Sequence, residues 1–310
     1  MLQRLWRTSP ELIATAALML IVLAGAIVGL VVDPTVITGA PAWLKPAKFA
    51  VSITIYTVTL AWIFTLIPEW TRTRLVVGWM AAITMVIEIA IISAQAWRGT
   101  TSHFNVGTVA DAVLFTIMGL AIVTQTLSTI AVAVALCRHR FEDLALGWAL
   151  RFGVCITIVG ALTGGLMTRP TRAQLEAARA GERMTVSGAH TVGAPDGGPG
   201  LIGTGWSTQH GDLRVPHFVG LHAMQALPLV ALLLAHRLSR QVRLRLVLIA
   251  AASYAALYVV LLIQALRGLP LVAADATAIT QLGAWAVGTA LAAGVVLFGG
   301  ADSPRHTAAI

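Results

Sequence analysis

Apolar residues occur in blocks of about twenty along most of the chain, the length of a helix that crosses roughly 30 Å of hydrocarbon. Polar, glycine-rich or proline-rich stretches separate these blocks. The predicted spans are residues 12–32, 47–67, 75–97, 109–136, 144–168, 216–236, 246–266 and 278–299. The pattern therefore predicts an all-α integral membrane protein, folded as an eight-span helical bundle.

Composition supports this class, since 57% of the 310 residues are hydrophobic and only 11% are charged. A net charge of +8 would suggest nucleic acid as the partner of a soluble protein. Here the basic residues fall in the connections between spans, where they set membrane orientation. The expected partner is the lipid bilayer, and no nucleic-acid partner is expected.

The distribution of these basic residues predicts the orientation. With the N-terminus in the cytoplasm, four basic residues occupy short outer segments: Lys45, Lys48, Arg98 and Arg267. Eleven occupy inner ones: Arg4, Arg7, Arg72, Arg74, Arg138, Arg140, Arg237, Arg240, Arg243, Arg245 and Arg305. Inner segments of membrane proteins carry the excess of arginine and lysine. Both termini are therefore expected in the cytoplasm, and the 169–215 connection outside it.

The two halves of the chain resemble each other. Gln95-Ala-Trp-Arg-Gly99 at the end of the third span matches Gln264-Ala-Leu-Arg-Gly268 at the end of the seventh, 169 residues later. The first and fifth spans match at a smaller offset, which one insertion at 169–215 explains. The prediction is two parallel four-helix repeats, 1–143 and 144–310, with the insertion in the second. The alternative is that small apolar residues align by chance.

The 169–215 connection is the only long polar segment. Thr171 and Gln174 suit a capping box at the start of a short helix that ends near Gly181. A glycine-rich stretch follows, which is either a solvated linker or a lid packed on the spans. Its His190, Asp196, Trp206 and His210 favour the packed lid.

Ionisable residues at membrane depth usually mark function. Glu88 lies nine residues before Trp97, about 14 Å deeper at 1.5 Å per residue, near the bilayer centre. Gln95 lies seven residues beyond Glu88, on the same helical face. The candidate acid–base residues on the outer side are Glu88, His103, Asp111 and His222. The alternative for Glu88 is a protonated carboxyl bonded to a neighbouring helix.

His103 and Asp111 flank the start of the fourth span. The acid could orient the imidazole, or both could bind a metal. The alternative is helix capping, with Asn105 or Thr108 at the free amides and Asp111 at the helix dipole.

Three histidines, His210, His217 and His222, are the candidate metal ligands, and a divalent metal such as zinc is the candidate cofactor. His217 and His222 are five residues apart, so they point about 140° apart on a helix rather than along one face. Any zinc site would therefore be assembled from several segments.

Other polar residues near the outer ends of the spans are candidates for binding a small ligand or a lipid headgroup. Lys45 and Lys48 open the second span, where snorkelling to lipid phosphate is the default interpretation. The ligand-binding candidates are Lys48, Gln95, Arg98, Arg214, Gln225, Gln264 and Arg267.

Three motifs carry a resemblance: Lys-Pro-x-Lys-Phe-Ala-x-Ser at 45–52, Arg-Gly-x-x-Ser-His-Phe-Asn at 98–105 and Gly-Asp-Leu-Arg-Val-Pro-His-Phe-x-Gly-Leu-His at 211–222. Together they resemble a family of bacterial multi-pass membrane proteins over most of the chain. The resemblance implies a location in the bacterial inner membrane and supplies no activity.

Three functions remain open from the sequence. The first is a membrane-embedded enzyme or ligand-binding protein with a His/Glu/Asp-rich pocket that opens outwards, with or without a metal. The second is a proton-coupled small-solute transporter with Glu88 as the carrier. The third is a membrane scaffold. For the first two, we predict that at least four of six residues converge within roughly 10 to 12 Å beneath the connection: Glu88, His103, Asp111, His210, His217 and His222.

Overall fold

The computed structural model describes residues 1–235 and 237–298. In that part of the chain seven helices are long and apolar enough to cross a membrane, or eight if one bent pair counts as a span. The helical membrane protein predicted from the apolar blocks is therefore confirmed. Three residues used in the predictions, His236, Gly299 and Arg305, lie outside the described residues.

Seven of the eight predicted spans each coincide with one long helix. The long helices are α2 (Pro10–Val32), α3 (Leu44–Thr65), α4 (Thr71–Trp97), α5 (Val109–Arg138), α6 (Leu144–Met167), α10 (Arg240–Leu266) and α11 (Ala276–Phe298). The predicted sixth span is the bent pair, α8 (Arg214–Leu221) and α9 (Ala223–Leu233), whose axes differ by 46°. A short helix, α1 (Leu2–Thr8), precedes the first span.

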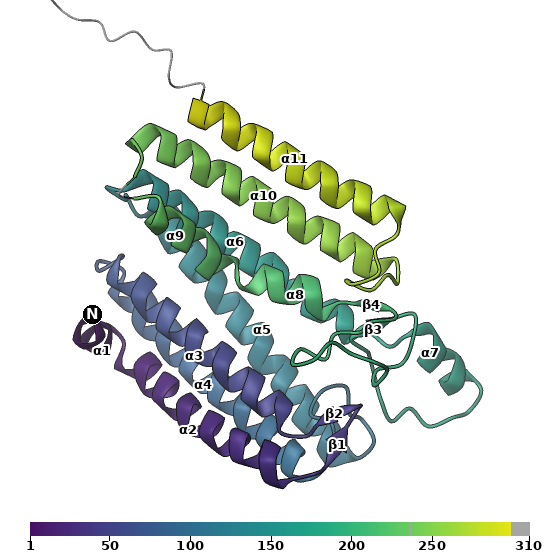
Figure 1. Cartoon of the computed structure of the whole chain (residues 1–310). Coiled ribbons are helices and arrows are strands. Elements are labelled where there is room, and N and C mark those ends of the chain that lie inside the picture. Colours follow the sequence, from purple (N-terminus) through teal and green to yellow (C-terminus); the bar gives the residue numbers. More distant parts are fainter. Residues whose placement is uncertain (236, 299–310) are drawn as a thin grey trace, which may run out of the picture.

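The helices run side by side in one bundle (Figure 1). In the first half α2 packs on α3 and α4, and α4 packs on α5. In the second half α6 packs on α8, α9 and α10, and α10 packs on α11. Contacts between α5 and α6 join the halves.

The bundle has two unlike ends (Figure 1). One end, here called the connection end, carries the hairpin of β1 (Val36–Ile37) and β2 (Ala40–Pro41) and the whole 169–215 connection. The N-terminus and α1 lie at the opposite end.

Glycine allows α6 and α8 to approach closely. A Cβ atom at Gly160 would lie 2.5 Å from the backbone of Gly220, too close for any side chain. Tyr258 of α10 donates a hydrogen bond to the Val159 carbonyl and shares another with Thr163, which fastens α10 to α6. The C-terminal part of α8 is thus held against α6, and Tyr254 of α10 donates to its Val219 carbonyl.

The 169–215 connection is folded and packed on the bundle. It contains α7 (Arg172–Arg179) and the antiparallel strands β3 (Thr191–Val192) and β4 (Gly211–Asp212). The predicted capping box of Thr171 and Gln174 is present at α7. Gln174 also bonds both backbone groups of Gly188, and residues 185–187 pair with the segment 104–106. The packed lid, rather than the solvated linker, is the arrangement observed.

Candidate functional site

The centre of the candidate site is a contact between Lys45 of α3 and His103, in the loop between α4 and α5. Lys45 Nζ donates a hydrogen bond to His103 Nδ1 at 3.0 Å, and Ser102 Oγ lies 3.1 Å from the same nitrogen. An ammonium group only donates, so His103 Nδ1 is the acceptor. His103 therefore carries its proton on Nε2.

Glu88 of α4 is a buried acid that interacts with the charge of Lys45. Its side chain is 1% exposed, and neither carboxyl oxygen has a hydrogen-bond partner among the described residues. Lys45 is the cation whose charge acts on it. A buried carboxyl without a partner needs a proton or a donor from outside the protein. The alternative in which Glu88 bonds a neighbouring helix is not what the described residues show.

The loop that carries His103 is strained. Phe104 has φ of 63°, a left-handed conformation that costs a non-glycine residue of this size about 1 kcal/mol or more. Its ring is buried and packs on His190 with the ring centroids 4.8 Å apart. Packing of Phe104 under the connection offsets the strain and brings His103 and His190 against the same ring.

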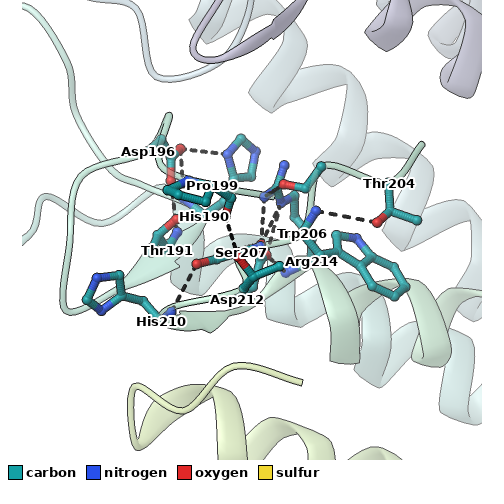
Figure 2. A network of polar contacts seen from close by, with 12 residues as sticks. His190, Thr191, Asp196, Pro199, Thr204, Trp206, Ser207, His210, Asp212 and Arg214 are labelled. Carbon is teal, nitrogen blue, oxygen red and sulfur yellow. Dashed lines mark hydrogen bonds and ion pairs between the residues drawn. The ribbon is translucent and has the colours of Figure 1, made fainter. Parts of the chain in front are cut away.

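His190 is held by Asp196 within the connection (Figure 2). His190 Nδ1 donates to Asp196 Oδ2 at 2.6 Å, and the backbone amides of His190 and Thr191 also donate to this carboxylate. Burial alone would raise the pKa of Asp196. The His190 ring and these amides outweigh that effect and hold the pKa of Asp196 well below its usual range. Burial lowers the pKa of His190, although Asp196 opposes that shift.

A second ion pair, between Arg214 and Asp212, holds the part of the connection that lies over the site. Arg214 at the start of α8 donates to Asp212 at 2.6 Å and to the Gly205 carbonyl, and the Ser207 amide donates to the same carboxylate (Figure 2). Lys48 of α3 donates to the Thr204 carbonyl at 2.8 Å. These bonds fasten the glycine-rich stretch over the head of α3.

His217 of α8 approaches from the second half. Its Nδ1 donates to the Gly160 carbonyl at 2.8 Å. The pKa of His103 is held well below its usual range. Burial is the largest cause, followed by the positive charge of Lys45 and by the neighbouring His190 and His217. The site therefore joins groups from both halves of the chain: Lys45, Glu88 and His103 from the first, His190, Asp196 and His217 from the second.

Other predicted residues form a separate cluster. Asp111 at the start of α5 accepts bonds from Gln95 at 2.9 Å, Arg98 at 2.8 Å and Thr108 at 2.7 Å. Thr108 in turn caps α5 by accepting from the Asp111 amide. Helix capping, and not orientation of His103, is therefore the contact that Asp111 makes.

The structure does not gather the three candidate metal ligands. His222 stacks on Phe218 with ring centroids 4.0 Å apart, and its Nδ1 bonds the Phe218 carbonyl. The His210 ring points away from the Asp212–Arg214 pair (Figure 2). Among residues 1–235 and 237–298, no group of three or more His, Cys, Asp or Glu side chains could hold a metal ion. The residues present therefore do not fit the zinc site considered from the sequence.

The remaining ligand-binding candidates mostly have partners within the chain. Arg267 pairs with Asp275 at 2.5 Å, as Arg98 and Arg214 pair with their own acids. Gln264 Nε2 donates to the Pro270 carbonyl at 2.7 Å. The buried Oε1 atoms of Gln225 and Gln264 lack partners among the described residues.

Of the six residues expected to converge, Glu88 and His103 both interact electrostatically with Lys45, His217 interacts with His103, and His222 interacts with His217. Asp111 bonds Gln95, Arg98 and Thr108 instead, and the His210 ring points away from the Asp212–Arg214 pair. The sequence had also left Lys45, His190 and Asp196 out of the candidate set. The available signal was a cation, Lys45, at the outer end of the span that precedes the one carrying Glu88. Comparisons of the chain with family models, curated proteins and solved structures find no match.

Proposed function

We propose that the chain is a multi-pass protein of the bacterial inner membrane, with both termini in the cytoplasm and an acid–base site at the extracytoplasmic end that binds a small polar ligand. The observation that carries the proposal is that two titratable side chains interact with Lys45. This lysine donates to His103 and acts on the unpartnered Glu88 carboxyl.

The chemistry of the site supports this proposal. Glu88 can accept or donate one proton, Lys45 can stabilise a negative charge, and His103 presents an Nε2–H donor. A ligand with a hydroxyl or acidic group would supply the partner that Glu88 lacks. Such a site serves an enzyme or a binding protein alike, and no step needs a metal.

The proposed orientation rests on the arginines. The connection end contains Arg98 and Arg267, each paired with an acid, whereas clusters such as Arg138 and Arg140 lie at the opposite end. The excess of basic residues at that end favours its placement in the cytoplasm. The connection would then face the extracytoplasmic side.

Matched contacts support tandem duplication of 1–143 and 144–310. Near the end of the bundle opposite the connection, here called the inner level, the charge of Arg74 acts on Glu11, and Arg243 forms an ion pair with Asp143. At the middle level Thr84 of α4 bonds Gln125 of α5, whereas Ser253 of α10 bonds Thr289 of α11. The outer level has the pairs Arg98–Asp111 and Arg267–Asp275. The partners in α4 and α10 differ by 169 positions in all three levels.

Proton-coupled transport is the second candidate, because polar contacts continue below Glu88. Thr84 lies one turn deeper on α4 and bonds Gln125, which also bonds Tyr56 of α3. Closer to the opposite end, Leu60, Phe64 and Leu136 fill the core. A one-sided polar path fits a ligand site better than alternating access. A scaffold role would leave Glu88 without a purpose.

Carbodiimide labelling tests the proposal. Dicyclohexylcarbodiimide partitions into membranes and reacts with protonated carboxyl groups in apolar surroundings. In the full-length protein in lipid vesicles, we expect mass spectrometry to find the label on Glu88 at neutral pH and to lose it in Glu88→Gln. The matched control Glu11→Gln, which removes another buried helical acid, should keep the label on Glu88. An unlabelled Glu88 would contradict a proton-accepting site.

A further inference from the structure

The connection contains an arrangement of His190 and Asp196 that goes beyond the proposed site residues. Asp196 receives hydrogen bonds from the His190 amide, the Thr191 amide and His190 Nδ1. Three donors fix both the position and the charge of this carboxylate. The His190 ring is therefore held in one orientation by an acid that is itself immobilised.

The hydrogen bond defines which tautomer His190 adopts. A carboxylate only accepts, so Nδ1 carries the proton and Nε2 carries the lone pair. The described residues place no hydrogen-bond partner on that Nε2. His103 has the opposite arrangement, with Nδ1 accepting from Lys45 and Nε2 protonated. The two histidines both pack on the Phe104 ring, and His190 offers an acceptor where His103 offers a donor.

The surroundings of His190 suit proton transfer. The charged and titratable groups that act on it or that it acts on are Asp196, Arg214, Lys45, His103 and His217. All except Asp196 are basic, so they favour a neutral imidazole until a proton arrives. Asp196 is the one acid that can stabilise the imidazolium formed.

We propose that His190 and Asp196 form the base of the site, in which His190 Nε2 removes a proton from a hydroxyl group or a water molecule bound beneath the connection. This inference rests on the proposed ligand site. The O–H bond breaks, an N–H bond forms at Nε2, and the electron pair stays on the oxygen, within the field of the Lys45 ammonium. Asp196 is a positioning residue, which keeps Nδ1 protonated.

A purely structural role for Asp196 would be to tie the 190–196 turn. The two roles differ in what they do to the ring. A structural tie affects how the connection folds, whereas a positioning role also sets the tautomer and the nucleophilicity of Nε2. The matched control is Asp212→Ala, which removes a second acid of the connection that accepts a backbone amide, together with its bond to Ser207 and its pair with Arg214.

The test uses the full-length protein, labelled with ¹⁵N-histidine, in lipid nanodiscs, with the His190 signals assigned by their loss in His190→Gln. We expect the Nδ1–H tautomer in the wild type and in Asp212→Ala, and a shift towards Nε2–H in Asp196→Ala. Diethyl pyrocarbonate, which modifies unprotonated imidazole nitrogen, should react with His190 severalfold more slowly in Asp196→Ala than in Asp212→Ala.

A wild-type His190 in the Nε2–H form would overturn the inference, even if Asp196→Ala fails to fold. Equal rates of modification in the two variants would overturn it as well. The carbodiimide result on Glu88 is independent of both readouts. If Glu88 is labelled but His190 is in the Nε2–H form, only the role of His190 as a base is refuted. If Glu88 is unlabelled but His190 is in the Nδ1–H form, the proposed ligand site is refuted.

Discussion

Gln95 and Gln264 end α4 and α10 in the same way. The backbone carbonyl of each glutamine accepts from the amide five residues later, and each side-chain Nε2 donates to the carbonyl six residues later, in Thr101 and Pro270. The following glycines, Gly99 and Gly268, have positive φ of 68° and 77°. This is the Schellman helix end, which needs glycine after the last helical residue.

The acids that pair with the arginines at these two helix ends differ in burial, which predicts unequal costs of mutation. Asp111 accepts three side-chain bonds and its side chain is 6% exposed, whereas Asp275 is 37% exposed. We expect Asp111→Ala to lower the free energy of unfolding by about 2 to 3 kcal/mol. Asp275→Ala should cost clearly less, and mostly through the lost helix cap.

Thermal unfolding of both variants in detergent would measure this difference. The double variant should lose the sum of the two effects, because the pairs lie in different halves of the bundle. A larger loss for Asp275→Ala would mean that burial does not decide the strength of these pairs.

The spans could be predicted because crossing a bilayer requires long apolar helices, and such blocks are visible in the sequence. The break between α8 and α9 could not. It falls at His222, beside Gly220, where the chain passes close to Gly160. That contact joins residues 60 positions apart, so no local pattern indicates it.

Only the part of the site that depends on local sequence could be predicted, because its other contacts join residues far apart in the chain. Membrane depth alone singled out Glu88, and its burial is confirmed. The sequence placed Lys45 at lipid phosphate, whereas the structure turns it towards His103, 58 residues away. His190 and Asp196 were noticed only as features of a lid, because their role depends on how the glycine-rich stretch folds back.

Close packing of α6 on α8 gives a second prediction. Gly160→Ala should destabilise the protein by about 1 to 3 kcal/mol, because the new Cβ would lie 2.5 Å from Gly220 and force the helices apart. Gly165→Ala on the same helix meets no atom within 4 Å and is the matched control. Equal thermal midpoints for the two variants would show that the helices do not approach so closely.

Protonation of the loop histidine gives a third prediction. Burial first and then Lys45 lower the pKa of His103, so below about pH 6.5 the unfolded chain binds a proton that the folded chain does not. Stability should therefore fall from pH 7 to pH 5. Asp196 contributes no slope in this window, since its lowered pKa leaves it ionised in both states.

The variant His103→Gln should reduce this pH dependence, with any loss of packing appearing equally at pH 8. The part that remains comes from His190, whose pKa burial also lowers. Thermal midpoints measured at pH 5, 6, 7 and 8 provide the comparison. An unchanged slope in His103→Gln would mean that His103 is not held neutral in the folded protein.

Orientation in the membrane gives a fourth prediction. In a background with Cys137 and Cys155 replaced by serine, single cysteines at the exposed positions Gln209 and Arg138 should label from opposite sides of the membrane. An impermeant maleimide added to intact cells should reach Gln209→Cys only. Labelling of Arg138→Cys alone would reverse the orientation and place the site in the cytoplasm.

The central claim is that Glu88 shares one acid–base site with Lys45. Infrared difference spectra of the protein in lipid, recorded as the pH is raised, test it most directly. We predict a carboxylic acid band near neutral pH that Glu88→Gln removes. In Lys45→Met the band should persist to higher pH, because a nearby cation favours the ionised acid, while the control Lys48→Met changes it less. A wild-type spectrum without this band, or one that Lys45→Met leaves unchanged, would contradict the account.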